Sequence, residues 1–247
     1  MKITRQWILA VFLSLIALNL CASPASFKAG AEYTILSTPQ PTNTGDKVEV
    51  IEFFGYFCGY CQTFDMPLAE WAEKNQYRIV FRRVAIGANE WSGLFYTLTA
   101  MGQLTEPIHQ KIFQAFQDER VRFKNEGQVF DFAASLGIDR NKFSETYRSS
   151  AVQDLLQNVE KIQDLYEIES VPTVIIDGRY MTAPAMVAGS NAVKSGADAY
   201  VATLKVMDWL VDQAHKNRST AKKQKKGKSK AGKSKTGKSK AGRSKVK

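Results

Sequence analysis

Two cysteines separated by two residues are the part of this sequence best suited to chemistry. They stand in the run Cys58-Gly59-Tyr60-Cys61. Where a strand is followed by a helix, this spacing is typical of a pair that alternates between dithiol and disulfide. The unpaired N–H groups and the positive dipole end of a helix favour the thiolate of Cys58. We therefore expect Cys58 to be the exposed nucleophile and Cys61 to be the buried, resolving partner.

Two other roles for the pair are a zinc half-site and a purely structural disulfide. Zinc needs two more ligands, and the only histidines, His109 and His215, are not at a paired spacing. A disulfide across two residues closes so small a loop that it adds little stability. A redox role is therefore the stronger interpretation. Because a stabilised thiolate favours the dithiol, it also makes the disulfide a better oxidant.

The pair is expected to lie between two strands that form a crossover. Residues 48–54 are rich in β-branched and aromatic side chains, which predicts a buried strand. A helix is expected from about Cys58 to Asn75, and residues 77–86 predict a second strand. A strand, helix and strand in this order imply that the two strands are parallel.

A helical block follows these elements. From Glu90 to about Glu169 apolar residues recur at helical spacing, which predicts four or five helices. Asp139 and Ser150 are expected at helix starts, and Gly137 at a helix end. Strand character then returns, so the predicted fold class is α/β, with a sheet interrupted by a helical insertion.

The last elements are two short strands and a helix. Residues 172–177 and 180–182 predict the strands, with a turn at Asp177-Gly178 between them, and residues 197–215 predict an amphipathic helix. The expected division of the chain is a leader at 1–25, a first sheet part at 26–89, a helical insertion at 90–169, a second sheet part at 170–215 and a tail at 216–247.

Composition excludes wholesale disorder but sets the tail apart. The chain has 247 residues, 44% of them hydrophobic, which is enough to bury a core. Residues 216–247 hold 15 of the 34 lysines and arginines and none of the 24 acidic residues, whereas residues 26–215 hold 17 basic residues and all 24 acidic ones. The tail repeats Gly-Lys-Ser-Lys with a period of five and has almost nothing apolar, so we expect it to be disordered.

Residues 1–25 have the pattern of a secretory signal peptide. Lys2 and Arg5 precede an apolar run at residues 7–18, and Ser23-Pro24-Ala25 supplies small residues for cleavage. An uncleaved membrane anchor is the first alternative, but a spanning helix needs roughly 20 apolar residues. A lipid-modified Cys21 is the second, but Leu20 precedes it where that processing prefers a small residue. Secretion would place the remaining cysteines in an oxidising compartment.

Glu52 is the other candidate for chemistry near the pair. It interrupts an apolar strand six residues before Cys58. An unpaired buried carboxylate is costly and has a raised pKa, so it could accept or return a proton as Cys61 changes state. Alternatively, Glu52 faces solvent or pairs with Arg82 or Arg83.

Together these features resemble the DsbA family of periplasmic thiol:disulfide oxidoreductases. The resemblance is carried by the run from Glu52 to Cys61, the helical insertion, the leader, and Val171-Pro172-Thr173 before a strand. It covers roughly residues 30–215 and leaves the tail unexplained. It implies a thioredoxin fold with an inserted all-helical domain, and a periplasmic location.

The resemblance also implies roles for single residues. Cys58 would form a mixed disulfide that Cys61 resolves, Glu52 would be the family's buried acid, and Pro172 would be a cis-proline facing the pair. The backbone around Val171 would then receive an extended client segment. A trans proline that opens a strand is the ordinary alternative. The residues expected to contact substrate are Gly59, Tyr60, Val171 and Thr173.

The residues between the cysteines depart from the family pattern. Many members carry Pro-His there, whereas this chain has Gly59-Tyr60, so we expect a weaker oxidant than the strongest members. Gly-Tyr also resembles the pair of DsbC-type isomerases, but only 32 residues, 26 to 57, precede Cys58, which is too few for their dimerisation domain. Phe57 and Phe64, with Tyr60, either line a shallow apolar groove or belong to the core.

The expected function is oxidation of reduced client proteins by a monomer that needs no cofactor beyond its own disulfide. A DsbB-like membrane oxidase linked to quinones would reoxidise the pair, as the resemblance implies. The alternatives are a disulfide isomerase or reductase using the same pair, and a surface polyanion-binding protein that acts through its tail. The tail is expected to bind an anionic membrane surface. Because no stacking side chains lie between its lysines, sequence-specific binding of nucleic acid is not expected.

Overall fold

The computed structural model describes residues 26–190 and 196–236, and within them the strands form one mixed sheet. Its strand order is β1-β5-β4-β2-β3. The bounds are Thr34–Ile35 for β1, Val48–Phe54 for β2, Ile79–Ala85 for β3, Thr173–Ile176 for β4 and Tyr180–Thr182 for β5. β2 and β3 are parallel, as the crossover predicts, whereas β4 is antiparallel to β2.

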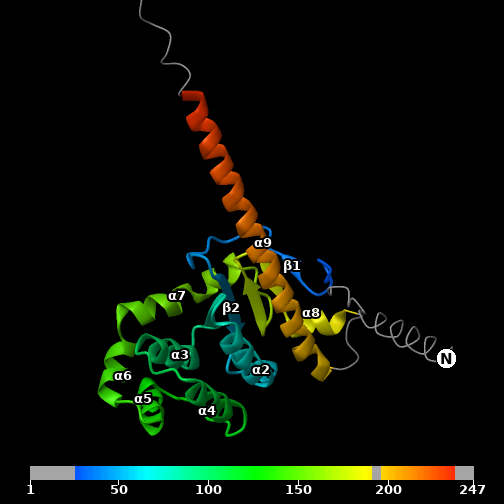
Figure 1. Cartoon of the computed structure of the whole chain (residues 1–247). Coiled ribbons are helices and arrows are strands. Elements are labelled where there is room, and N and C mark those ends of the chain that lie inside the picture. The colour runs from blue at the N-terminus through cyan, green and yellow to red at the C-terminus, as the bar shows by residue number, and fades with distance from the viewer. Residues whose placement is uncertain (1–25, 191–195, 237–247) are drawn as a thin grey trace, which may run out of the picture.

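Helices cover the sheet and form a separate cluster beside it (Figure 1). α2 spans Gly59–Asn75, α8 spans Pro184–Gly189 and α9 spans Gly196–Thr236. The predicted helical block is confirmed as α3 (Glu90–Ala100), α4 (Glu106–Gln117), α5 (Glu126–Ser135), α6 (Arg140–Tyr147) and α7 (Ser150–Leu165). Asp139 caps α6, because its carboxylate accepts from the N–H groups of Asn141 and Lys142. The expected α/β architecture with a helical insertion is therefore confirmed.

The central strand β2 is buried on both faces, because alternate side chains enter two different cores. Val50 lies in the core that α2 and α9 form on one face, with Leu68 and Met207. Ile51 lies in the core on the other face, where Val159 of α7 packs. This two-sided burial explains why residues 48–54 read as a nearly continuous apolar run.

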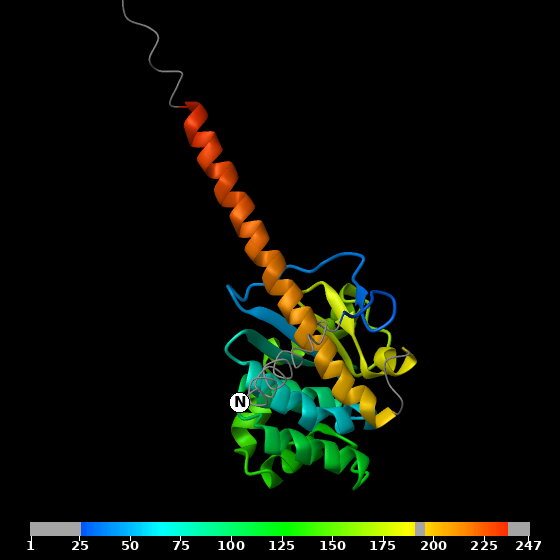
Figure 2. The same cartoon turned by 45° about the vertical axis from the view of Figure 1, so that its right-hand side comes forward.

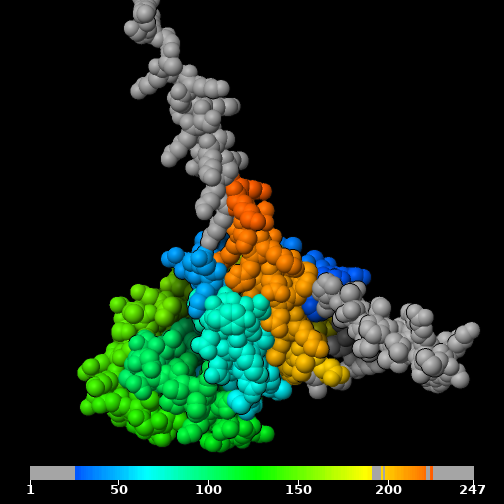
Figure 3. Space-filling view, in the orientation of Figure 1, coloured from blue at the N-terminus to red at the C-terminus, as the bar shows by residue number. Residues whose placement is uncertain are grey.

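The redox pair lies where the sheet meets the helical insertion. Cys58 and Cys61 belong to the same core cluster as Phe54 of β2, Leu94 of α3 and Phe113 of α4. The space-filling view shows the surface of α2 between the helical insertion on one side and α9 on the other (Figure 3). The start of α2 is thus supported by both halves of the molecule.

The last helix is longer than its apolar pattern predicts. The sequence places its end near His215 and disorder from Lys216, but α9 continues to Thr236. The boundary at Lys216 is corrected because Arg218 still belongs to the body: its guanidinium donates to Thr42 Oγ1 at 2.8 Å and to the carbonyl of Lys47 at 2.7 Å, and it pairs with Asp177. Asn217 donates to the hydroxyl of Tyr180 at 2.9 Å.

Beyond Arg218, α9 projects away from the rest of the molecule, as two views of the molecule show (Figures 1 and 2). A helix without a packing partner is marginal in water, and glycine weakens it further. Disorder of the lysine-rich tail in solution therefore stays a prediction, and residues 237–247 lie outside the described residues.

The proposed leader, residues 1–25, also lies outside the described residues. Among the helices that are described, none combines the length and the apolar character needed to cross a bilayer.

Candidate active site

Cys58 occupies the position immediately before the first residue of α2. Its backbone is extended (φ −97°, ψ 106°), and its Sγ accepts a hydrogen bond from the N–H of Cys61 at 3.1 Å. The N–H of Cys58 donates to the carbonyl of Gly55 at 3.0 Å, which closes the turn between β2 and α2. The sulfur is therefore the cap of its own helix, as the position of the pair in the sequence predicts.

The surroundings of Cys58 stabilise its thiolate. Its pKa falls from the ordinary 9.0 to about 7, chiefly because the Cys61 thiol donates a hydrogen bond to it. Burial opposes this shift, and the backbone N–H groups of Cys61 and Tyr60 add to it. The sequence predicts the backbone contribution, but not that the second thiol contributes more. At pH 7 about half of Cys58 is then ionised, against about one part in a hundred for a thiol with a pKa of 9.

Cys61 lies deeper than Cys58 and keeps its proton. Cys58 exposes 9% of its surface, less than the sequence suggests, whereas Cys61 exposes none. Burial raises the pKa of the Cys61 thiol, and its hydrogen bond to Cys58 raises it further. Both cysteines are free thiols in this structure. The pair thus consists of one activated, reachable sulfur and one shielded sulfur.

Glu52 is both buried and paired with an arginine, whereas the sequence alone leaves burial and pairing as alternatives. Its side chain is 2% exposed, and Arg83 Nε donates to its Oε2 at 3.0 Å. The parallel register of β2 and β3 sets Glu52 directly opposite Arg83. Burial, partly opposed by Arg83, raises the pKa of Glu52 to about 7. The charge of Glu52 in turn raises the pKa of Cys61.

Sequence patterns missed the buried polar residues next to this ion pair. Arg83 also donates to Asp65 Oδ1 at 3.0 Å and to Glu106 Oε1 at 2.8 Å. Asp65 lies on α2, one turn after Cys61, so an acid on the apolar face of the expected helix was the available signal. The pairing itself required the fold, because Glu106 comes from the helical insertion.

The loop before β4 closes the site from the other side. The Val171–Pro172 peptide bond is cis, as the resemblance implies. The carbonyl oxygen of Val171 lies 3.4 Å from the Sγ of Cys58. Beside this loop is a largely apolar hollow of about 570 Å³, lined by Tyr60 of α2, the loop residues, α8 and the start of α9 with Tyr200. An extended chain in this hollow would pass next to the reactive sulfur.

The other residues expected to contact substrate differ in their accessibility. Gly59 and Tyr60 are exposed, Tyr60 by 74%, and a Cβ at Gly59 would meet nothing within 4 Å. Thr173, in contrast, is 3% exposed, and its hydroxyl donates to the carbonyl of Ser170 at 2.7 Å. The structure therefore leaves the Thr173 side chain out of the accessible site, because it is the first buried residue of β4.

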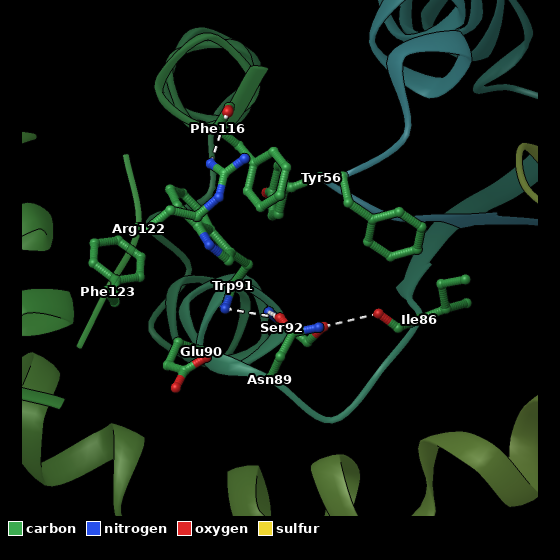
Figure 4. Close-up of a pocket in the computed structure, with 10 residues that line it drawn as sticks. Tyr56, Ile86, Asn89, Glu90, Trp91, Ser92, Phe116, Arg122 and Phe123 are labelled. Carbon is green, nitrogen blue, oxygen red and sulfur yellow. Dashed lines mark hydrogen bonds between the residues drawn. The ribbon is translucent and has the colours of Figure 1, made fainter. Parts of the chain in front are cut away.

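The aromatic residues around the pair also differ in their accessibility. Phe64 is fully buried and stacks on Tyr200, with ring centres 5.7 Å apart, so it is core and not groove. Phe57 is 50% exposed and faces a second hollow of about 310 Å³. Figure 4 shows this hollow, with Trp91 and Phe123 in its wall and the guanidinium of Arg122 over the ring of Phe116, 3.9 Å from its centre.

Comparison with known proteins places the chain in one family. The model of the DsbA-like thioredoxin domain matches residues 68–201. The chain is 30% identical over 224 residues to the thiol:disulfide interchange protein DsbA of Pseudomonas aeruginosa, covering 89% of this chain and all of that protein. It is 34% identical over 197 residues to the protein of the same name from Burkholderia cepacia, covering 78% of this chain and 88% of that protein.

The solved structures agree with the sequence matches. The crystal structure of Pseudomonas aeruginosa DsbA aligns with a TM-score of 0.68 at 31% identity, covering 79% of this chain and 97% of that one. The coverage of the relatives is nearly complete, so the resemblance extends over both the sheet and the helical insertion.

Proposed function

Because the chain belongs to the DsbA-like family of thiol:disulfide oxidoreductases, we propose that it donates its Cys58–Cys61 disulfide to reduced client proteins. A client thiolate attacks Cys58 Sγ, and the bond to Cys61 breaks, leaving Cys61 to take up a proton. A second client thiolate then attacks the client sulfur of the mixed disulfide and releases Cys58 as a thiolate. The client is oxidised by two electrons and the pair is reduced by two.

The single observation that carries this proposal is the difference between the two sulfurs. Cys58 has a pKa of about 7 and is the more exposed, which suits it as the attacked sulfur and as a good leaving thiolate. Cys61 is fully buried with a raised pKa, which suits it as the inner sulfur that is shielded from client thiols and takes up a proton when the disulfide opens. Glu52, with a pKa of about 7, is the proposed group that returns a proton to Cys61.

Clients would bind across the loop at residues 170–172. The Val171 backbone lies close to Cys58 and offers an edge for strand-like pairing. The apolar hollow beside Tyr60 would hold client side chains without demanding a particular sequence. We assign Cys58, Cys61, Glu52 and Pro172 to catalysis, and Gly59, Tyr60 and Val171 to client contact. Thr173 would act only through its backbone.

The remaining features of the proposal come from the family and from the sequence. We propose a monomer in the periplasm, delivered there by residues 1–25 and reoxidised by a DsbB-like membrane enzyme linked to quinones. The reaction needs only the pair itself as its redox group. The basic tail would hold the protein at an anionic membrane surface.

A second candidate, isomerase or reductase activity with the same pair, is favoured by one observation. A pKa of about 7 stabilises the thiolate less than the value of about 3.5 that is typical of DsbA. Less stabilisation of the dithiol means a weaker oxidant, as the Gly59-Tyr60 dipeptide also suggests. The redox state inside the cell separates the two candidates.

A trapping experiment tests the proposed roles of the two cysteines. Cys61→Ser, expressed with the leader, should accumulate reductant-sensitive adducts with other proteins, because its Cys58 thiolate can attack client disulfides and no Cys61 thiol is present to displace the client again. Cys58→Ser is the matched control and should form none. In the unmodified chain, rapid alkylation should find the pair mostly oxidised; a mostly reduced pair would favour the isomerase or reductase. Adducts on Cys61 in the Cys58→Ser variant would contradict the assignment.

A further inference from the structure

Tyr56, in the loop that leads to Cys58, makes two hydrogen bonds to the helical insertion. Tyr56 is 2% exposed, and its hydroxyl lies 2.7 Å from Nδ1 of His109. The backbone carbonyl of the same residue accepts a hydrogen bond from Nε2 of Gln117 at 2.7 Å. His109 and Gln117 both belong to α4, so this helix holds Tyr56 by its side chain and by its backbone.

The opposite edge of the His109 ring, which carries Nε2, is directed at α2. Its Nε2 lies 3.3 Å from Oδ1 of Asp65, and both side chains are almost fully buried. Burial lowers the pKa of His109, so the ring is neutral and has one donor and one acceptor. The angle of this contact is not that of a hydrogen bond, but the nearby Asp65 carboxylate favours the tautomer with its proton on Nε2. Nδ1 is then left to accept from the Tyr56 hydroxyl.

We propose that His109 is a positioning residue of the redox reaction, which joins the loop at residues 55–58 to α2 through Tyr56 and Asp65. The proposal rests on the proposed role of Cys58. Its thiolate is stabilised by the thiol of Cys61 and by N–H groups in the first turn of α2. Those donors stabilise a charge only if they are held in place before it forms. Fixing the loop against the helix keeps the sulfur at hydrogen-bond distance from them.

Packing alone is the competing explanation for a buried histidine. The ring of His109 lies among those of Phe54 and Phe113, with centres 5.0 and 5.1 Å away. If packing were its whole role, phenylalanine would replace it with a loss of stability but no change in thiol chemistry. A positioning role predicts a change in the chemistry even from Tyr56→Phe, which removes only one hydroxyl.

The test compares Tyr56→Phe, His109→Phe and the double variant with Tyr96→Phe as the matched control. Tyr96 is also buried in the insertion, and its hydroxyl donates to the carbonyl of Ala85 at 2.8 Å, away from the loop. Two quantities are measured: the equilibrium constant of the pair with glutathione, and the pH midpoint of thiolate absorbance in the reduced protein.

Tyr56→Phe and His109→Phe should each shift the equilibrium with glutathione toward the disulfide form of the pair by about two- to tenfold. This is the effect expected for the loss of one hydrogen bond. The thiolate midpoint should rise with it. The double variant should shift no further than the larger single one, because both changes break the same hydrogen bond. Tyr96→Phe should lose stability, but its equilibrium with glutathione and its thiolate midpoint should stay the same.

An unchanged equilibrium and midpoint in Tyr56→Phe, with a stability loss like that of Tyr96→Phe, would overturn the proposal. If His109→Phe does not fold, Tyr56→Phe decides alone. Failure of the proposed function is a separate result, because it would appear as an unmodified chain whose pair does not exchange with glutathione at all.

Discussion

At the scale of single residues, burial acts in opposite directions on groups only a few residues apart. It raises the pKa of Glu52 and of Cys61, because it penalises their charged forms. At Cys58 the same penalty is outweighed by hydrogen bonds from Cys61 and from the backbone, so the pKa falls. The site therefore holds a proton on the inner sulfur and releases it from the outer one.

Glu52 should make the stability of the reduced protein depend on pH. In the unfolded chain it loses its proton near pH 4.5, but in the folded protein it keeps it to about pH 7. The free energy of unfolding should therefore fall as the pH rises between these values, by roughly 3 kcal/mol in total. Glu52→Gln should abolish this fall, while Arg83 keeps Asp65 and Glu106 as partners.

Urea unfolding of the reduced protein at pH 4, 6 and 8 measures this effect. The variant should gain stability relative to the unmodified chain as the pH rises. Glu70→Gln, which removes a carboxylate from the exposed side of α2, controls for the loss of one negative charge. If the free energies of unfolding of Glu52→Gln and of the unmodified chain changed with pH in the same way, the pKa of Glu52 would not be raised in the folded protein.

Local signals in the sequence point to candidate residues, whose catalytic roles stay predictions. The spacing of Cys58 and Cys61 and the position of Glu52 in an apolar strand identify all three. The partner of Glu52 could not be chosen, because Arg82 and Arg83 are neighbours that point to opposite faces of β3. Arg82 in fact pairs with Glu49. The sequence offers His109 only as a metal ligand, since its contacts with Tyr56 and Asp65 join three distant segments.

At the scale of elements, strong patterns gave accurate bounds and weak ones were missed. The predicted strands at residues 48–54 and 180–182 match β2 and β5, and the helix start at Ser150 matches α7. β1 has two residues and α8 has six, too few to show a period. The antiparallel direction of β4 depends on how the chain returns from the insertion, which one sequence does not contain.

Packing inside the helical insertion predicts that Gly93→Ala is destabilising. Alanine would favour α3 by about 1 kcal/mol. However, its Cβ would lie only 2.6 Å from Cε2 of Tyr147 on α6, and overpacking of this kind costs about 1–3 kcal/mol. We expect a net loss of up to about 2 kcal/mol in urea unfolding.

Gly189→Ala is the matched control, because a Cβ at that position in α8 would meet nothing within 4 Å. It should leave stability unchanged or raise it slightly. If Gly93→Ala were as stable as the unmodified chain, α3 and α6 would not be packed as closely as the structure has them.

At the scale of the whole molecule, charge is separated along α9. The helix starts at the apolar hollow beside the redox pair and leaves the body after Arg218. The eight lysines of α9 after Thr220, from residue 222 to residue 235, therefore lie on the part of the helix that leads away from the site. The body carries more acidic than basic residues and would be repelled by an anionic surface. A protein bound through its tail would keep its redox site directed away from that surface.

Removal of the tail should abolish membrane binding. A chain ending at Thr220 should bind vesicles of phosphatidylglycerol and phosphatidylcholine more than about a hundredfold less tightly at low salt, since each basic residue near the surface contributes about 1 kcal/mol. Binding of the full chain should weaken as salt is added. Exchange with glutathione should be the same for both chains.

Two controls define this test. Replacement of four lysines by glutamine keeps the length of the tail and should weaken binding in part; the four are Lys222, Lys223, Lys225 and Lys226. Vesicles of phosphatidylcholine alone should bind neither chain. Equal binding by the shortened chain would refute a membrane role for the tail. Tighter binding to random-sequence DNA than to anionic vesicles would point to nucleic acid as the partner.

Titration of Cys58 in the reduced protein tests the activation of this sulfur directly. Thiolate absorbance is followed against pH, with Cys58→Ser as the blank. We expect a single midpoint near pH 7, because Cys61 and the first turn of α2 stabilise the anion. A midpoint near 9, the ordinary value of a cysteine thiol, would show that these contacts do not activate the sulfur and would contradict the proposed donation of disulfides.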